Sequence, residues 1–542
     1  KIMQLKYFKF FYFSIFFQLV FSQPDIRFNP FDWNLYGESG SINSISFGDR
    51  YAFIGTSGSG VVRFNINNNR FEEPITTAQG LSSNFITAVH YAENGMLWIA
   101  TRDNLHYSFS GYGDWRTVSL MSIGVSKRNF INRLGSDGKD IWVESSGMLF
   151  KLDGNTGIPL ETTIRQNKNI SWSSGNSLFY TDFSDILLKY TTAGGWMNTL
   201  NTFINPDGEN IKITTLEEND FNQIIIGCED GTFFVGNKNM RILEPYKFGL
   251  SSKDVFSFDG NSSFWVGGRT YGPKSGISYI DIDRNIYDQY LFKNIININE
   301  TPIYSIGSFK KMVFFGGDEN IITYDKKEDE WSQIFLPSGL RNNYVKKIIK
   351  NNENIWIGTP NGLQIVDYKS KTILENDITD ILKNVFIHDL LIFKDFVYIA
   401  TEFNLLIYDI KNDIIFEYLE YGYEDKDMVF PSSQTAFTAI TQSKNYIFFS
   451  NRESIIKLDT SNRKWSMAVN SVIYRGEEII DFDVSNNDMF IATAYKLTYF
   501  NIKKNTPEYF NYNFLGNINK IKVDSRKVWV GTSEGIVTYR YK

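Results

Sequence analysis

Residues 97–101 read Leu-Trp-Ile-Ala-Thr, and close copies stand at residues 355–359 (Ile-Trp-Ile-Gly-Thr) and 528–532 (Val-Trp-Val-Gly-Thr). Nine weaker copies complete a series in which the fourth position, often Gly or Ala, recurs about every 43 residues, the length of one β-propeller blade. This position is called the marker position below. The repeat therefore predicts twelve blades along the chain.

The second repeat shows how one unit divides into four strands. We expect strands over residues 85–91, 96–101 and 105–108, and a fourth that begins at Trp115. Runs of β-branched and aromatic residues bounded by Asn, Asp and Gly are typical of antiparallel strands joined by hairpins. Little of the sequence has the 3.6-residue period of an amphipathic helix. The fold class predicted is all-β.

The tryptophans and the marker position support this register. One group of tryptophans occupies the second position of the second strand, and another begins the fourth strand: Trp98, Trp142, Trp265, Trp356 and Trp529, then Trp115, Trp196, Trp331 and Trp465. Since both faces of a blade are covered by its neighbours, one bulky ring per repeat fills the gap between blades. A Gly or Ala at the marker lets adjacent sheets approach closely. We interpret these aromatic rings as core.

The two ends of the chain predict how a ring closes. Residues 535–542 form the third strand of the last unit, and residues 32–36 resemble a fourth strand, so pairing the two would hide the last sheet edge. Single rings hold about four to eight blades. We therefore expect two propellers of six plus six blades, over residues 23–290 and 291–542, the second completed by residues 32–36. Seven plus five is the alternative.

The first 22 residues predict a secretory signal peptide. A basic start precedes an apolar run over residues 10–21, and small residues precede a cut after Ser22. The run is short for a membrane span, although an uncleaved anchor is the alternative. We expect an extracytoplasmic protein, in the periplasm, on the cell surface or secreted, without a stable membrane span after signal cleavage.

Composition excludes several functions. Among 542 residues the formal net charge is -6, and the absence of a long basic run argues against nucleic-acid binding. The single Cys228 cannot form an internal disulfide or a Cys-based zinc site. We expect His90, His106 and His388 to be packed or to line a channel. Residues 531–535 match a G-x-S-x-G pattern, but a strand follows where a hydrolase needs a helix. No catalytic residue, metal or cofactor is predicted.

A second motif precedes the pentapeptide in several repeats. Gly80-Leu81-Ser82-Ser83-Asn84 stands before residues 97–101, and similar Gly-Leu segments stand at residues 249–253 and 339–343. These repeats resemble the two-component regulator propeller family. The resemblance implies paired propellers of the kind that form the periplasmic sensor of bacterial hybrid histidine kinases, often for glycans. Similar propellers form the N-terminal part of a type IX secretion surface component.

One loop departs from the repeat. Residues 268–276 make a longer connection than their counterparts, and insertions on one face of a repeat array often carry binding specificity. Arg269, Tyr271 and Lys274 would offer a flat ring and charged donors to a carboxylate or sugar. Arg102, in the equivalent turn of the second repeat, is a further candidate. The alternative is an ordinary solvated loop tip.

These observations predict an exported, non-catalytic propeller protein that binds ligands, as a sensor-like or scaffold protein. Its partner would be a glycan, a peptide or an envelope protein at a propeller face. One alternative is a polysaccharide-degrading enzyme whose carboxylates converge on a ring axis, because paired acids cleave glycosidic bonds without His or Cys. Another is an assembly component of a secretion or surface complex.

Overall fold

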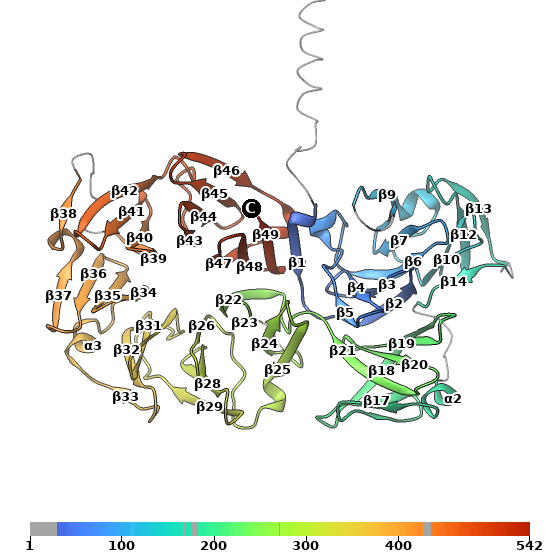
Figure 1. The fold of residues 1–542 in the computed structure, drawn as a ribbon, viewed down its shortest axis with the longest axis horizontal. Helices are drawn as coiled ribbons and strands as arrows, with labels where there is room; N and C mark the ends of the chain where they lie inside the picture. The colour runs from blue at the N-terminus through green and yellow to red at the C-terminus, as the bar shows by residue number, and fades with distance from the viewer. Residues whose placement is uncertain are drawn as a thin grey trace, which may run out of the picture.

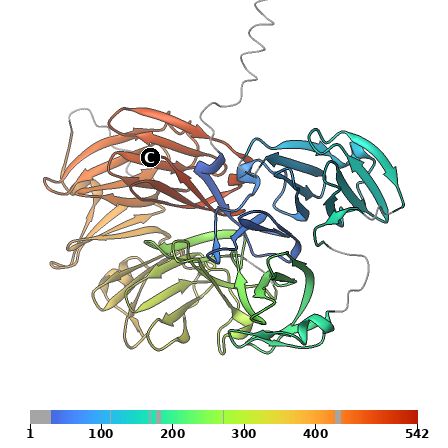
Figure 2. The same ribbon diagram turned by 45° about the vertical axis from the view of Figure 1, so that its right-hand side comes forward.

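The computed structural model describes residues 30–542 apart from 110, 112, 166–168, 176–182, 270–271 and 426–434. Within these residues the strands form eleven sheets, most of them of four antiparallel strands. The sheets are arranged as two rings that lie side by side (Figures 1 and 2). The all-β, double-propeller prediction is confirmed. The predicted signal peptide lies outside the described residues.

The C-terminal ring holds seven sheets. Its strands are β22 (Asp254–Gly260), β23 (Phe264–Arg269), β24 (Gly276–Asp281), β25 (Ile286–Leu291), β26 (Ser305–Ser308), β27 (Met312–Gly316), β28 (Asn320–Asp325), β29 (Glu330–Phe335), β30 (Lys347–Asn351), β31 (Asn354–Thr359), β32 (Gly362–Asp367), β33 (Ile373–Leu374), β34 (Ile387–Phe393), β35 (Phe396–Thr401), β36 (Leu405–Asp409), β37 (Ile414–Glu417), β38 (Tyr423–Glu424), β39 (Phe437–Ser443), β40 (Tyr446–Asn451), β41 (Ser454–Asp459), β42 (Lys464–Asn470), β43 (Asp481–Ser485), β44 (Asp488–Ala492), β45 (Leu497–Asn501), β46 (Thr506–Phe510), β47 (Ile518–Val523), β48 (Lys527–Thr532), β49 (Gly535–Arg540) and β1 (Trp33–Tyr36). A short helix, α3 (Asp377–Ile381), follows β33.

The N-terminal ring shows four sheets among the described residues. Its strands are β2 (Ile42–Phe47), β3 (Tyr51–Thr56), β4 (Val61–Asn65), β5 (Arg70–Phe71), β6 (Ile86–Tyr91), β7 (Met96–Thr101), β8 (Asn104–Phe109), β9 (Arg116–Ser119), β10 (Arg133–Ser136), β11 (Ile141–Ser145), β12 (Met148–Leu152), β13 (Pro159–Thr163), β14 (Ser171–Trp172), β15 (Thr191–Thr192), β16 (Met197–Asn198), β17 (Thr202–Ile204), β18 (Asn210–Glu218), β19 (Gln223–Cys228), β20 (Thr232–Asn237) and β21 (Ile242–Lys247), with the helix α2 (Ser184–Leu187).

The chain closes the C-terminal ring through its two ends, as predicted. Strand β1 pairs antiparallel with β49, so that Trp33 lies opposite Tyr539 and Tyr36 opposite Ile536. The inner strands contact one another in the order β22, β26, β30, β34, β39, β43 and β47, and β47 contacts β22 again. The N-terminal ring is therefore inserted between β1 and β22.

Two details of the predicted organisation are wrong. The division into six plus six blades fails because the C-terminal ring has seven sheets, as in the alternative. The predicted boundary at residues 290 and 291 falls inside β25, whose sheet belongs to the C-terminal ring, so the rings change between β21 and β22. The physical reason is that the repeat keeps the same period across the boundary between the rings. The repeat copy around Thr181 lies outside the described residues, and Trp196 lies beside β16, which joins the sheet of β18 and does not form a blade's fourth strand.

Close approach of neighbouring sheets at the marker glycines is confirmed. A Cβ added to Gly267 would lie 2.5 Å from Cγ2 of Ile303, at the start of the next inner strand. The same relation joins Gly531 to Val255, which closes the C-terminal ring, and Gly227 to Ile42, which closes the N-terminal ring. The second-strand tryptophans are all buried, as expected of core: Trp98, Trp142, Trp265, Trp356 and Trp529.

Candidate binding site

A β-bulge recurs near the start of the inner strands. In β22 the register shifts between Val255 and Ser257, and in β34 between Ile387 and Asp389, which leaves Phe256 and His388 unpaired. Because a bulge leaves one residue unpaired, it turns that side chain out of the regular alternation. Equivalent residues occur in every sheet of the C-terminal ring and are called the bulge positions below: Phe256, Tyr304, Lys346, His388, Thr438, Ile480 and Asn519.

An Asn or Thr at a bulge position ties its sheet to the next one. The Asn519 amide donates a hydrogen bond to the Val255 carbonyl at 2.9 Å, across the closing seam of the ring. In the N-terminal ring, the Asn43 amide donates to the Ile86 carbonyl at 2.7 Å. Both acceptors belong to the first residues of the next inner strand. The polar bulge residues therefore have a structural role.

Five of the seven sheets depart from this pattern: the β43 sheet carries Ile480, and the other four are adjacent to one another. The bulge positions of the β22, β26, β30 and β34 sheets are occupied by Phe256, Tyr304, Lys346 and His388. Among the described residues, none of these four side chains makes a hydrogen bond to the next inner strand. A run of four consecutive replacements on one side of the ring indicates a role other than holding the sheets together.

The aromatic side chains of this region form a continuous row, called the aromatic arc below and made of Phe256, Tyr304, Tyr344, Phe386 and His388. Successive ring centroids are 5.5, 5.1, 6.3 and 4.4 Å apart in that order. Every ring of the arc is partly exposed. The arc follows the starts of four inner strands, which surround the central channel of a propeller, so it borders one mouth of that channel.

A lysine accompanies the arc. Lys346 is exposed, and in the described part of the chain its ammonium has no ion pair or hydrogen bond. Desolvation by the channel wall lowers its pKa, and the carboxylates of Asp389 and Asp481 act in the opposite direction. Asp481 belongs to a sheet three places further around the ring, so the ammonium lies over the channel. Burial and then the Lys346 charge lower the pKa of His388 to about 4, which keeps its imidazole neutral at pH 7.

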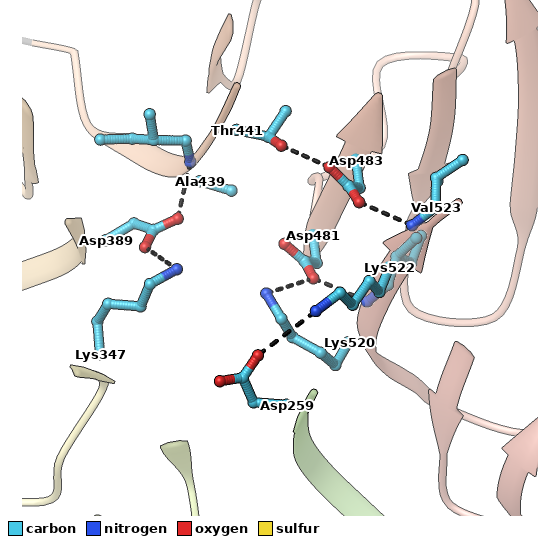
Figure 3. A network of polar contacts seen from close by, with 12 residues as sticks. Asp259, Lys347, Asp389, Ala439, Thr441, Asp481, Asp483, Lys520, Lys522 and Val523 are labelled. Atoms are coloured by element: carbon cyan, nitrogen blue, oxygen red, sulfur yellow. Dashed lines mark hydrogen bonds and ion pairs between the residues drawn. The ribbon is translucent and has the colours of Figure 1, made fainter. Parts of the chain in front are cut away.

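Deeper in the channel, aspartates tie the inner strands together (Figure 3). The Asp389 carboxylate accepts the backbone N–H of Ile440 at 2.8 Å, and Asp481 accepts that of Ile521 at 2.8 Å. Asp483 and Asp259 repeat the device with Val523 and Ser308, both at 2.7 Å. In each case the acceptor lies on one inner strand and the donor on the next, so these carboxylates join neighbouring sheets.

Lysines neutralise most of these aspartates. Lys347 lies 2.7 Å from Asp389, and Lys520 lies 2.9 Å from Asp481. Burial alone would raise the pKa of Asp389, but the Lys347 and Lys520 charges outweigh it and lower that pKa. The carboxylates have backbone and lysine partners, an arrangement that suits structural ties better than an acid and base poised for catalysis.

In the N-terminal ring a chain segment packs between the inner strands and lines one side of a pocket. Ser173 and Ser174 run between the inner strands: the Ser174 hydroxyl bonds Ile45, and the Ser173 hydroxyl lies 2.8 Å from Nδ1 of His90. The Glu217 carboxylate accepts the Ser174 N–H at 2.7 Å, and burial raises the pKa of Glu217 to about 8. The aromatic arc belongs to the C-terminal ring.

The structure separates the predicted site residues. Arg269 lies at one end of the aromatic arc, 4.9 Å from the Phe256 ring centroid. Lys274 donates to the Ser39 carbonyl at 3.1 Å, where the two rings meet. Arg102 lies over the Phe130 ring in the N-terminal ring, and Tyr271 is outside the described residues. The four residues do not form one site.

Four of the arc residues were not predicted from the sequence, because they lie at the inner strands and not in the long loop: Phe256, Tyr304, Tyr344 and Phe386. A signal was present. Each inner strand begins with two β-branched or other apolar residues separated by two positions, as in Ile387-His388-Asp389-Leu390, and the bulge residue is the second of the four. Aligning that tetrapeptide would have shown Asn or Thr in several repeats and Phe256, Tyr304 and Lys346 in others.

The histidines are packed or line a channel, as predicted. His90 is buried between the hydroxyls of Ser136 and Ser173, and the His106 ring lies between those of Ser82 and Thr117. His388 belongs to the aromatic arc. In the described ranges, no group of three His, Cys, Asp or Glu side chains could hold a metal ion. No helix of those ranges is long and apolar enough to cross a bilayer.

Burial of His90 predicts a pH-dependent stability. Burial lowers its pKa to about 4, while the unfolded chain titrates near 6.5. Between these two pH values His90 binds a proton in the unfolded state but not in the native state, so the free energy of unfolding falls as pH drops from 6.5 towards 4. Relative to wild type, we expect His90→Gln to lose about 2 kcal/mol less free energy of unfolding between pH 6.5 and 5. Urea titrations at each pH measure this, and parallel curves would contradict it.

Comparisons with known proteins give limited similarity. No family model matches the chain. A stretch of 136 residues, 24% of the chain, is 29% identical to a protein described as histidine kinase P4 of Formosa agariphila, and it covers 9% of that protein. The chain therefore spans less than a tenth of this relative's length.

Two similar solved structures cover most of the chain. One is the extracellular domain of a hybrid two-component system from B. thetaiotaomicron, 15% identical, covering 92% of this chain and 75% of that one with a TM-score of 0.42. The other is PorZ, a surface component of the type IX secretion system of Porphyromonas gingivalis, 14% identical, covering 92% and 74% with a TM-score of 0.42. Both kinds of protein named by the sequence resemblance thus occur among the similar structures.

Proposed function

We propose that this chain is an exported, non-catalytic double β-propeller that binds a glycan, a peptide or an envelope protein at the mouth bordered by the aromatic arc. One observation carries the proposal: four adjacent bulge positions exchange a residue that ties sheets together for Phe256, Tyr304, Lys346 and His388. Partly exposed aromatic rings beside a few polar groups are typical of ligand sites. The predicted signal peptide and the sequence resemblance support export.

The channel aspartates support the non-catalytic assignment. Asp389 and Asp481 each accept a backbone N–H and pair with a lysine, so their oxygens are engaged within the fold. A glycosidase needs one protonated acid and one free carboxylate on opposite sides of the scissile bond. If Asp481→Asn abolished turnover of any polysaccharide by the wild-type protein, the assignment would be overturned.

Binding at the aromatic arc is tested with glycan and peptide arrays. For any ligand found, we expect Tyr344→Ala and Phe386→Ala each to weaken binding about 30-fold, as expected for a buried aromatic anchor. Tyr446→Ala is the matched control, because Tyr446 is an exposed aromatic residue at the start of β40, at the other end of the ring. Unchanged affinity in both arc variants would place the site elsewhere.

A further inference from the structure

We propose that the ligand of this mouth is an acidic saccharide, whose carboxylate or sulfate group pairs with Lys346 while its sugar ring lies against the aromatic arc. The inference rests on the proposed function and names the ligand class of the same site. It follows from the charges that line the channel and from the backbone groups that the channel leaves available.

Lys346 differs from the lysines below it in the channel. Lys347 pairs with Asp389, Lys520 with Asp481, and Lys522 with Asp259. Lys346 has no carboxylate within ion-pair distance among the described residues, although the adjacent sheets carry several acids. An ammonium held at a protein-lined mouth without a counterion is matched by an anionic group from outside.

Two acidic groups near the mouth are engaged by other residues, while the exposed Asp318 lies near Tyr304 of the arc. The Glu402 carboxylate pairs with Arg341 at 3.0 Å and accepts the Phe386 N–H at 3.1 Å. Burial raises the pKa of Asp254, and the Arg269 charge and the Asn519 amide act in the opposite direction. None of these contacts involves Lys346. Arg269, at the far end of the arc, offers a second cation whose planar guanidinium suits a carboxylate or sulfate.

The inner strand edges favour a saccharide over a peptide. An extended peptide binds a sheet edge through backbone hydrogen bonds. Here the inward N–H groups of Ile440, Ile521 and Val523 are already occupied by aspartates of the preceding sheets. Partly exposed rings such as Tyr344 offer an apolar surface to the face of a sugar ring and require no strand edge.

Matched pairs of ligands test the inference by calorimetry. One pair is oligogalacturonate and its methyl ester, and the other is chondroitin sulfate and unsulfated chondroitin. We expect wild type to bind the acidic member of at least one pair about tenfold more tightly, the value of one charge-assisted hydrogen bond. The pair in which the acidic member binds more tightly shows whether the site recognises a carboxylate or a sulfate group. The preference should fall as salt is added.

Lysine variants locate the effect. Lys346→Met should bind both members of the pair as wild type binds the neutral one, and Lys346→Arg should keep the preference. Lys310→Met is the matched control, since Lys310 is an exposed lysine in the turn between β26 and β27, at the other end of the ring. All variants should unfold at the wild-type denaturant concentration.

The outcomes separate the inference from the proposed function. If Lys346→Met keeps the preference, or if only peptides bind and the arc variants weaken them, the acidic saccharide is excluded while binding at the mouth stands. If neither array yields a ligand, both proposals fail.

Discussion

Trp33→Ala is expected to lower the free energy of unfolding by about 4 kcal/mol and to open the seam of the C-terminal ring. The Trp33 ring is 2% exposed, stacks on Tyr539 at 4.2 Å and packs edge-on against Phe510 at 5.2 Å and Phe514 at 5.5 Å. It is the main side-chain anchor of β1, which covers the otherwise unpaired edge of β49. Denaturant titration measures the loss, and hydrogen exchange at β49 reports the seam.

Trp331→Ala provides the matched control for the seam. Trp331 packs against two rings of its own sheet, with centroid distances of 4.5 Å to Tyr324 and 5.8 Å to Phe315, and it lies away from β1. We expect it to reduce stability without faster exchange in β49. If β49 stays protected in Trp33→Ala, the ring does not depend on this anchor for closure.

Gly267→Ala is expected to cost about 3 kcal/mol, the upper end of the range for overpacking. The added Cβ would lie 2.5 Å from Cγ2 and 2.6 Å from Cβ of Ile303, so the two sheets would have to separate. Gly267 has no positive φ, so the strain arises from packing and not from the backbone conformation.

Gly531→Ala tests the same position in a looser setting. There the nearest atom to an added Cβ is Cγ1 of Val255, at 3.1 Å, which a shift of a few tenths of an ångström relieves. We expect a loss below about 1 kcal/mol. Equal losses of unfolding free energy in Gly267→Ala and Gly531→Ala would mean that the distance from the marker glycine to the next sheet does not determine the cost of an added Cβ.

Much of the fold could be predicted from sequence because the repeat is a packing requirement. Trp98 and Trp356 recur where a ring must fill the gap between blades, and Gly267 and Gly531 where the sheets must meet. The division into rings could not be predicted in this way. It depends on which inner strand each marker residue contacts. Gly227 contacts Ile42, far back in the sequence, whereas Gly267 contacts Ile303 in the next repeat. The spacing of the repeats along the chain does not distinguish these two kinds of contact.

The site was less predictable than the fold. The length of the loop predicted a site at Arg269 and Lys274, but of these two residues only Arg269 lies beside the aromatic arc. Tyr304 and Lys346 come from regular positions in the repeat, directly before β26 and β30, and they are equivalent to Phe256 and His388, which a bulge turns out of the sheet. A bulge changes the direction of a side chain without changing the repeat length, so spacing alone could not reveal it.

The seam between β1 and β49 also constrains how the protein is made. Trp33 is synthesised long before its partner Tyr539, because the whole N-terminal ring and most of the C-terminal ring lie between them in the sequence. During synthesis the N-terminal ring can fold first, but the C-terminal ring stays open until β49 has been made. Contacts between residues so far apart in sequence form slowly. A chain that stops early retains an exposed strand edge, which marks it for aggregation or for removal by proteases.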